Sequence, residues 1–167
     1  MSPLITVKTL ASWLGENALC ILDATALLPG ETSNPDEAFL KAHIPGSLRF
    51  DIDLFSDPES TQPHTVPSAA RFGALGVSRS TRVVFYDQGN TASACRGWWL
   101  ARLFGHDQVF VLDGGLPAWQ RDNQPVEQGS APTPTVQPYA CHTRFARVKG
   151  LGDMLDIVSS ARQPILD

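Results

Sequence analysis

The chain has 167 residues, enough for one complete hydrophobic core and too few for two domains of ordinary size. Its formal net charge is −4 and 18% of its residues are charged, which argues against a protein built mainly to bind nucleic acid or an anionic membrane. With 13 Gly and 13 Pro, the composition predicts a folded chain that is rich in turns.

The sequence indicates a cytoplasmic protein. No apolar run approaches the roughly 18 residues that a membrane span needs, and the first residues lack both a basic leader and an arginine-rich amphipathic pattern. The three cysteines, without a C-x-x-C motif, suggest neither a disulfide framework nor a zinc site. We therefore expect a reducing compartment.

One sequence pattern occurs twice. Residues 7–14 and 148–155 both read V-K-x-L-x-x-x-L, and each copy is followed by an apolar stretch that ends in Ile-Leu-Asp. A helix followed by a strand is predicted at both places. Because a lone strand cannot close a core, we interpret residues 1–140 as one complete domain. Residues 141–167 are then a linker with the first helix and strand of a truncated second domain.

Short β-branched or aromatic runs alternate with helical patterns in the first domain. The composition of Gln128–Pro138, rich in Pro, Gly, Ser and Thr, is typical of an exposed linker behind it. The predicted strands are Leu19–Asp23, Val83–Asp87 and Val109–Asp113, and the predicted helices are Thr91–Phe104 and Gly115–Arg121. This alternation predicts an α/β fold, a doubly wound parallel sheet with helices on both faces.

Asp23, Asp87 and Asp113 follow the three strands, at the sheet edge where ligands of such folds bind. The backbone N–H groups of the turn after Asp87 converge at a helix N-terminus and predict an anion site. Asp87 either caps these N–H groups or acts as a carboxylate nucleophile, as in haloacid-dehalogenase-type phosphatases. Those phosphatases need a second Asp two residues later, where this chain has Gly89. Residues 87–91, D-Q-G-N-T, also match weakly the D-x-G-x-T pattern in the phosphate loops of sugar-kinase-like folds.

Three motifs resemble one family. Residues 39–50 read F-L-K-A-H-I-P-G-S-L-R-F, which is similar to the rhodanese signature F-x-x-x-H-I-P-G-A-x-x-F and departs from it only at Ser47. Residues 111–119, V-L-D-G-G-L-P-A-W, resemble that family's closing strand, Gly-Gly turn and Trp helix. Residues 86–99, with Y-D-Q-G-N and R-G-W-W, resemble the first half of tandem sulfurtransferases.

The resemblance implies transfer of sulfane sulfur from 3-mercaptopyruvate or thiosulfate, through a cysteine persulfide, to a thiol or cyanide acceptor. It implies no metal and no cofactor. In tandem members the cysteine belongs to the second half, and the first half has an Asp at the matching place, as Asp87 is here. The 167-residue chain alone is therefore expected to be inactive, because a carboxylate has no sulfur chemistry equivalent to that of a thiol.

The resemblance also implies two supporting catalytic residues, Asp53 and His64. In the 3-mercaptopyruvate members an Asp and a His at these places have been proposed to form a triad with a Ser of the second half. Asp53 would orient His64, which would assist proton transfer. The alternative is that Asp53 caps a turn and His64 is a solvated loop residue.

Other candidate residues are predicted to be structural. His43 is expected to be a buried, hydrogen-bonded residue of the I-P-G turn. Cys95 is expected to be a small buried residue of its helix, and Cys20 is expected in the core. The acidic residues at 51, 53 and 57 lack the Gly hinge and distal Glu of a calcium loop, so we predict no metal site there.

The sequence is compatible with three functions. The first is the non-catalytic half of a tandem sulfurtransferase, whose partners are a small sulfur donor, a thiol acceptor and an intramolecular second rhodanese domain, without nucleic acid or membrane. The second is a stand-alone degenerate rhodanese domain that acts as a binding or anion-sensing module. The third makes Asp87 a phosphate-handling residue.

Overall fold

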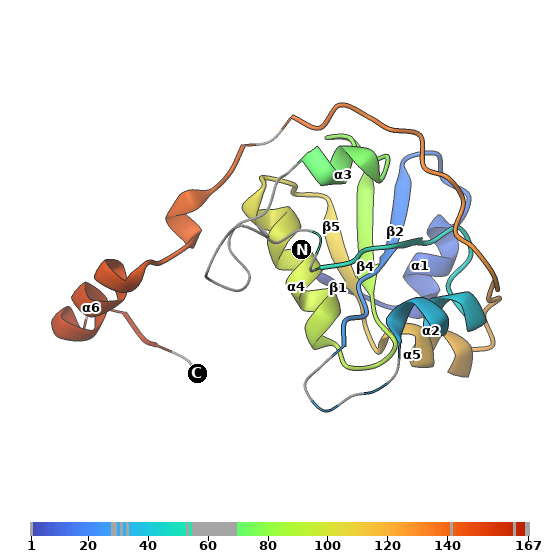
Figure 1. Cartoon of the computed structure of the whole chain (residues 1–167), viewed down its shortest axis with the longest axis horizontal. Helices are drawn as coiled ribbons and strands as arrows, with labels where there is room; N and C mark the ends of the chain where they lie inside the picture. The colour runs from blue at the N-terminus through green and yellow to red at the C-terminus, as the bar shows by residue number, and fades with distance from the viewer. Residues whose placement is uncertain are drawn as a thin grey trace.

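A five-stranded parallel sheet forms the centre of the protein (Figure 1). The computed structural model describes residues 2–27, 30, 32, 34–52, 54, 70–140, 142–161 and 163–165. The strand order is β1-β5-β4-β2-β3. The strands are β1 (Leu4–Ile5), β2 (Leu19–Asp23), β3 (Leu48–Arg49), β4 (Arg82–Tyr86) and β5 (Val109–Leu112). The three strands expected from the sequence are thus confirmed, to within one residue at each end.

Helices cover both faces of this sheet, as the sequence predicted (Figure 1). Helices α3 and α4 supply core residues to one face, and α1 and α5 supply them to the other. The helices of the domain are α1 (Val7–Trp13), α2 (Pro35–Lys41), α3 (Ala70–Ala74), α4 (Ala92–Leu103) and α5 (Gly115–Arg121). The expected helices at 91–104 and 115–121 are therefore confirmed.

The alternation of side chains along a strand explains how one short segment contributes to the core clusters on both faces of the sheet. In β4, Val83 and Phe85 point into the cluster under α4, whereas Val84 and Tyr86 point into the cluster under α1 and α5. Successive side chains of a strand leave opposite faces of the sheet, so a strand that is buried on both faces must be apolar throughout. All four of these side chains are fully buried.

Local N-terminal signals start α1 and also α2, a helix that the sequence analysis does not predict. The Thr6 hydroxyl accepts the Thr9 N–H ahead of α1, and the Asn34 side chain accepts the Asp36 N–H ahead of α2. Both are N-cap arrangements that satisfy an otherwise free backbone donor. Pro35 opens α2, a position that needs no N–H.

The segment 128–138, which we call the strap, lies against the domain although its composition predicted an exposed linker. The Gly129 N–H donates to the Leu40 carbonyl at 2.8 Å and the Gln137 N–H donates to the Gly73 carbonyl at 2.9 Å. A side chain on Gly73 would place its Cβ 2.3 Å from the Gln137 carbonyl oxygen. The strap therefore runs close along the domain, with most of its side chains facing solvent.

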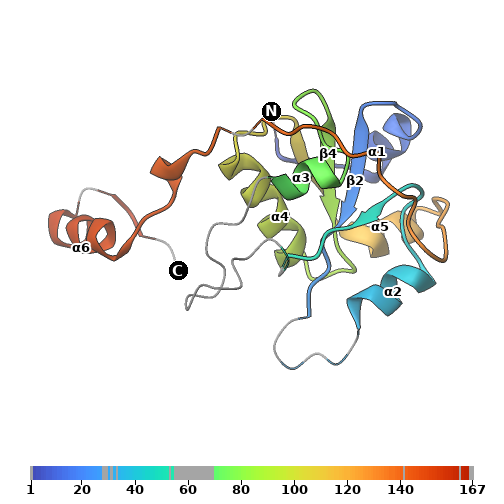
Figure 2. The ribbon, with the colours of Figure 1, turned by 45° about the horizontal axis from the view of Figure 1, so that its top comes forward.

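The last helix, α6 (Leu151–Ser160), stands apart from the sheet and its covering helices (Figures 1 and 2). A helix was expected here from the second copy of the repeat, and it begins at Leu151 rather than at Val148. None of its described residues is buried. Ile165 is not part of a strand, and the other two residues of the expected strand lie outside the described residues.

Within the described part of the chain, no helix is both long and apolar enough to cross a membrane.

Candidate functional site

The loop after β4 places Asp87 at the carboxyl edge of the sheet, with 1% of its surface exposed. One carboxylate oxygen accepts the Gly89 N–H at 3.0 Å, and the other accepts the Ala94 N–H in the first turn of α4 at 3.1 Å. Asp87 therefore caps the loop, which is the structural alternative considered above. Both oxygens are engaged by the backbone groups that would otherwise be available to an external anion.

A polar network fixes this loop to the end of the neighbouring strand β2. The Gln88 N–H donates to the Thr25 hydroxyl at 3.0 Å, and the Thr25 hydroxyl in turn donates to the Asp23 carboxylate. The Gln88 side-chain amide donates to the other Asp23 oxygen at 3.2 Å. Asp23 is completely buried, and such a carboxylate is tolerated because its oxygens are hydrogen-bonded.

A glycine brings α5 against the same loop. The Leu116 N–H donates to the Asp87 carbonyl at 2.9 Å. A Cβ on Gly115 would lie 2.4 Å from that carbonyl oxygen, and Gly115 has a φ of +56°. Only glycine combines this close approach with a left-handed conformation at low cost. The Gly-Gly turn of the sequence motif therefore sets the backbone position of Asp87.

Cys95 corrects an expectation, because it is exposed rather than a buried residue of its helix. α4 begins at Ala92 and turns Ser93, Ala94 and Gly97 toward the sheet, which leaves Cys95 on the outer side of the first turn. Partial burial and, next, the charge of Asp87 raise the pKa of the Cys95 thiol. Cys95 is thus accessible, but its surroundings disfavour the thiolate that a nucleophile needs.

Sequence reasoning missed the role of Ser47, the one departure from the family signature. Its hydroxyl lies 2.9 Å from the Tyr86 hydroxyl, and both residues are fully buried. The Ile44 N–H also donates to the Tyr86 oxygen, at 3.3 Å. Burial and the charge of Asp23 raise the pKa of Tyr86, so the phenol stays protonated. A buried Tyr after Val-Val-Phe needs a polar partner, and Ser47 supplies one.

The structure describes two of the four remaining candidate residues, His43 and Cys20. His43 is buried as predicted, donates from Nδ1 to the Phe39 carbonyl at 2.9 Å and stacks on the Phe39 ring. Cys20 belongs to the core as predicted. Asp53 and His64, the two expected supporting catalytic residues, lie outside the described residues. Their proposed roles therefore stay predictions.

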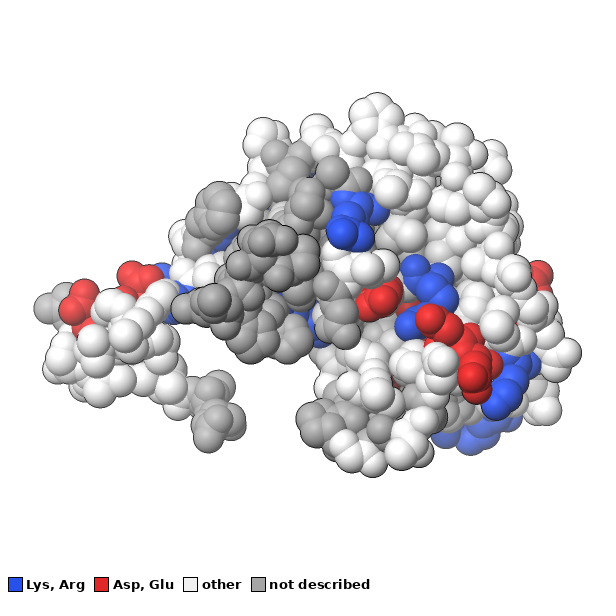
Figure 3. All heavy atoms as spheres, viewed as in Figure 1, with Lys and Arg blue, Asp and Glu red and all other residues white. Residues whose placement is uncertain are grey.

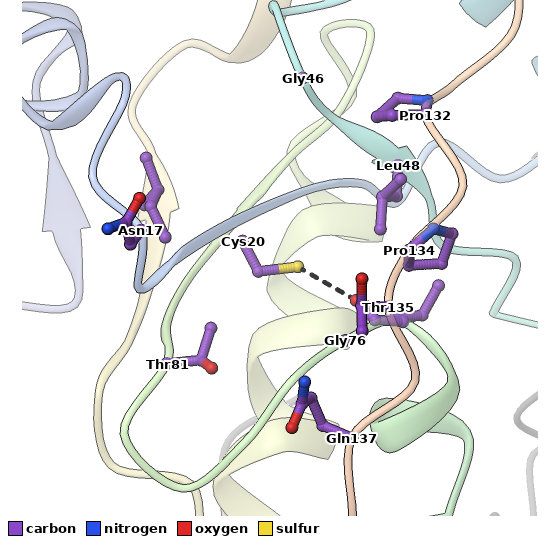
Figure 4. A pocket seen from close by; sticks show the side chains of 12 residues that line it. Asn17, Cys20, Gly46, Leu48, Gly76, Thr81, Pro132, Pro134, Thr135 and Gln137 are labelled. Atoms are coloured by element: carbon purple, nitrogen blue, oxygen red, sulfur yellow. Dashed lines mark hydrogen bonds between the residues drawn. The ribbon is translucent and has the colours of Figure 1, made fainter.

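A hollow of about 270 Å³ lies at the amino end of β2 beneath the strap. Figure 4 shows the Cys20 side chain in it, with Pro132 and Pro134 of the strap alongside. The Cys20 thiol lies 3.8 Å from the Leu75 carbonyl oxygen. Burial raises the pKa of this thiol to about 12, so almost no thiolate forms at neutral pH. This hollow offers no nucleophile.

A family model matches most of the domain. The family model "Rhodanese-like domain" matches residues 6–122, from the start of α1 to the end of α5. The chain belongs to the rhodanese-like domain family. The matched range includes the buried strands and the loop that carries Asp87, so the family assignment rests on the part of the fold that forms the candidate site.

Two curated relatives of the chain are sulfurtransferases by name. The chain is 42% identical to the mitochondrial thiosulfate/3-mercaptopyruvate sulfurtransferase 1 of Arabidopsis thaliana, over 77% of this chain and 35% of that protein. It is 40% identical to the 3-mercaptopyruvate sulfurtransferase of Escherichia coli K12, over 83% of this chain and 53% of that protein. The chain therefore spans between about a third and about half of the length of these two relatives.

A solved structure matches almost the whole chain. The crystal structure of SseA from Escherichia coli, described as a 3-mercaptopyruvate sulfotransferase with the rhodanese fold, superposes with a TM-score of 0.87 at 32% identity. The match covers 96% of this chain and 63% of that chain. The residues beyond the family model, which include the strap and α6, are thus also largely within the structural match.

Proposed function

We propose that this chain is the amino-terminal, supporting half of a 3-mercaptopyruvate or thiosulfate sulfurtransferase. The observation that carries the proposal is the engagement of both Asp87 oxygens by backbone N–H groups, at the position that matches the catalytic cysteine of the second half in the tandem members that the chain resembles. The family match and the sulfurtransferase relatives support the reaction class. Residues 1–140 form the domain in this proposal, and residues 141–167 open the second one.

The chemistry of the proposal belongs to a cysteine of the second half. Its thiolate attacks the thiol sulfur of 3-mercaptopyruvate or the outer sulfur of thiosulfate. The C–S bond of the first donor or the S–S bond of the second breaks, and the leaving group is the pyruvate enolate, which takes up a proton to give pyruvate, or sulfite. The resulting persulfide is attacked at its outer sulfur by a thiol or cyanide acceptor, and the thiolate returns. Asp87 takes part in neither step, because a carboxylate cannot hold sulfane sulfur.

Asp53 and His64 are the proposed contributions of this half to the reaction. Asp53 orients the imidazole of His64, and His64 assists proton transfer at the cysteine or the leaving group. Arg49 is the last residue of β3, and Asp51 follows two residues later, shortly before Asp53 in the sequence. The chain therefore enters the segment with Asp53 from the same sheet edge that carries Asp87.

Exposed apolar residues support a second domain. Leu151, Leu155 and Val158 of α6 are 78%, 61% and 62% exposed. The two leucines match Leu10 of α1 and Leu14, the residue directly after α1, in the repeat, and Leu10 is fully buried in the core. A helix with such a face is normally covered by further structure. In the proposal the rest of the second domain covers it.

The cytoplasm is the proposed compartment.

Activity measurements on the purified 167-residue chain test the proposal. With 3-mercaptopyruvate or thiosulfate as donor and cyanide as acceptor, we expect no pyruvate or thiocyanate above the level without protein. Cys95→Ser and Cys141→Ser variants serve as controls for adventitious thiol chemistry. Turnover by the chain that survives both substitutions contradicts the proposal.

The intact mass of the native gene product separates this proposal from the stand-alone module. A product close to twice the 18.1 kDa of this chain supports the tandem enzyme. A stable native product of 18.1 kDa supports the binding module instead. Fusion to the second half, followed by Asp53→Asn and His64→Gln substitutions, then tests the two supporting residues by the change in the pH profile of kcat.

A further inference from the structure

A buried histidine lies under the segment by which the chain leaves the domain. His106, between α4 and β5, is 2% exposed. Its Nε2 donates to the Thr81 carbonyl at 2.8 Å, and its Nδ1 lies 3.3 Å from the Tyr139 hydroxyl. The Tyr139 ring also stacks over the imidazole, with 6.0 Å between the ring centroids. One ring nitrogen of His106 is therefore held by the domain, and the other faces Tyr139.

The segment that covers this histidine is tied to the domain at both ends. We call residues 139–140 and 142–144 the clasp, which follows directly on the strap. Ahead of the clasp the Gln137 N–H donates to the Gly73 carbonyl at 2.9 Å, and at its end the Arg144 N–H donates to the Leu103 carbonyl at 2.7 Å. Figure 1 shows this part of the chain passing α3 on its way to α6. The clasp forms no strand of the sheet, so it can part from the domain while the sheet stays intact.

The covering segment brings no charge that would compensate a proton on His106. Residues 128–143 contain no Asp, Glu, Lys or Arg. Figure 3 shows the upper right of the molecule, over which the strap runs in Figure 1, as largely free of charged atoms. A buried imidazolium loses its hydration and needs a carboxylate to offset that cost. The closed clasp therefore favours the neutral imidazole.

The charged groups of the domain that act on His106 do not reverse this preference. Burial is the largest influence and lowers the pKa of His106, and the Arg79 guanidinium lowers it further. Backbone hydrogen bonds and the Asp107 carboxylate raise it. Asp107 is already bound by two guanidiniums, those of Arg102 at 2.5 Å and Arg144 at 2.9 Å, which offset its charge.

The two sides of the His106 ring differ in how firmly they are held. Thr81 leads directly into the central strand β4, whereas Tyr139 rests on the clasp. A proton that arrives on Nδ1 of His106 gains hydration when the clasp parts from the domain. We propose that the clasp is a pH-sensitive device, which opens when His106 takes up a proton and loosens the connection between the domain and the chain that follows it.

The direction of the pH dependence follows from the histidine. An accessible imidazole has a pKa of about 6.5, and the pKa of His106 in the closed state lies below its ordinary value. The contribution of neutral His106 to closure is therefore complete above about pH 6.5 and is lost as the pH falls below that value. At pH 5 an accessible imidazole favours the open clasp by at most about 30-fold relative to pH 7.

Hydrogen exchange of the 167-residue chain measures this opening. The Arg144 amide reports on the clasp, and the Phe85 amide of β4 reports on the sheet. Each exchange rate is divided by that of an unstructured peptide at the same pH, which gives the opening constant. For Arg144 we expect this constant to rise by at least about 3-fold and at most about 30-fold from pH 7 to pH 5. We also expect Arg144 to be less protected than Phe85, because the clasp opens locally.

Two substitutions and one direct titration assign the effect. His106→Gln removes the titrating ring and is expected to abolish the pH dependence of the Arg144 amide. His142→Gln, at an exposed histidine within the clasp itself, is the matched control and is expected to keep it. The amide spectrum reports whether each variant is folded. In the parent chain, imidazole ¹⁵N shifts are expected to show His106 predominantly neutral at pH 6, a readout that needs no variant.

Four results overturn the inference. They are an Arg144 opening constant that changes by less than about 3-fold, equal protection of Arg144 and Phe85, a folded His106→Gln variant that retains the pH dependence, and a protonated His106 at pH 6 under a protected clasp. The inference does not depend on the proposed sulfur transfer. Sulfur transfer by the isolated chain would leave the clasp untouched, and a clasp insensitive to pH would leave the proposed sulfurtransferase role untouched.

Discussion

Leu10 and Leu151 hold the same place in two copies of one sequence pattern, yet Leu10 is 0% exposed and Leu151 is 78% exposed. Leu10 packs in the cluster that contains Ile21, Val84 and Phe110, under α1. Leu151 opens α6, a helix without buried residues among those described. The same apolar spacing is thus part of a core in one copy and of a free surface in the other.

This pair provides a matched test of stability. Leu10→Ala removes a fully buried side chain and leaves a cavity, so we expect it to lower the free energy of unfolding by about 2–5 kcal/mol. Leu151→Ala removes a side chain that solvent already surrounds, and we expect a change within about 0.5 kcal/mol. Urea unfolding followed by tryptophan fluorescence measures both. Equal losses for the two variants would show that α6 packs on the domain in solution.

The second prediction concerns the close approach of α5 to the Asp87 loop. Gly115→Ala places a Cβ 2.4 Å from the Asp87 carbonyl oxygen at a φ of +56°, and we expect a loss of at least about 2 kcal/mol. Gly152→Ala in α6 is the control, because no atom lies within 4 Å of the added Cβ. We expect Gly152→Ala to leave the midpoint of urea unfolding unchanged and to increase the helix content slightly. A Gly115→Ala variant as stable as the parent would refute the geometry.

The third prediction concerns pH. His106 is buried, its Nε2 donates to the Thr81 carbonyl at 2.8 Å, and its Nδ1 lies 3.3 Å from the Tyr139 hydroxyl. Burial lowers the pKa of His106, an effect to which Arg79 adds and which Thr81 and Asp107 oppose. The unfolded chain therefore binds the proton more readily than the folded one.

The contribution of neutral His106 to the free energy of unfolding is therefore fully present above about pH 6.5, the pKa of histidine in the unfolded chain. This contribution is lost as the pH falls below that value. We expect the free energy of unfolding to decrease below pH 6.5 by at most about 1.4 kcal/mol per pH unit for this one group. His106→Gln should remove this part of the slope, whereas His142→Gln, at an exposed histidine, should keep it. A slope unaffected by His106→Gln would assign the effect to other groups.

The fourth prediction separates two thiols. In a Cys141→Ser background, an aromatic disulfide reagent is expected to modify Cys95 promptly, because Cys95 is exposed. Cys20 is expected to react only as the domain opens, since it is buried and its thiol pKa is raised to about 12. Mass spectrometry of the time course distinguishes the sites. Modification of Cys20 as fast as Cys95 would show that the strap leaves the hollow beneath it open.

Most of the domain's elements follow from patterns that are visible in the sequence. Runs such as Val83–Phe85 are apolar throughout because both faces of their strand are buried, and this identifies a central parallel strand without knowledge of its neighbours. Glycine and N-cap residues mark where helices begin, as Gly115 and Asn34 do. The family motifs added the expectation that Asp87 occupies a nucleophile's position.

The site itself required the fold. The exposure of Cys95 depends on the residue at which α4 begins, and a shift of one residue in a helix turns a side chain by about 100°. The pairing of Ser47 with Tyr86 joins residues far apart in the chain, so no local pattern contains it. The strap lies on the domain through backbone hydrogen bonds that its composition does not encode.

By itself, then, the sequence determined the alternating strands and helices and the parallel sheet, because these depend on local propensity and on apolar periodicity. Its motifs also carried the resemblance to the rhodanese family. Tertiary structure alone decided that both Asp87 oxygens are occupied, that Leu10 is buried while Leu151 is exposed, and that Tyr139 covers His106. These are relations between distant residues, and they arise only when the packed sheet brings separate loops to one edge.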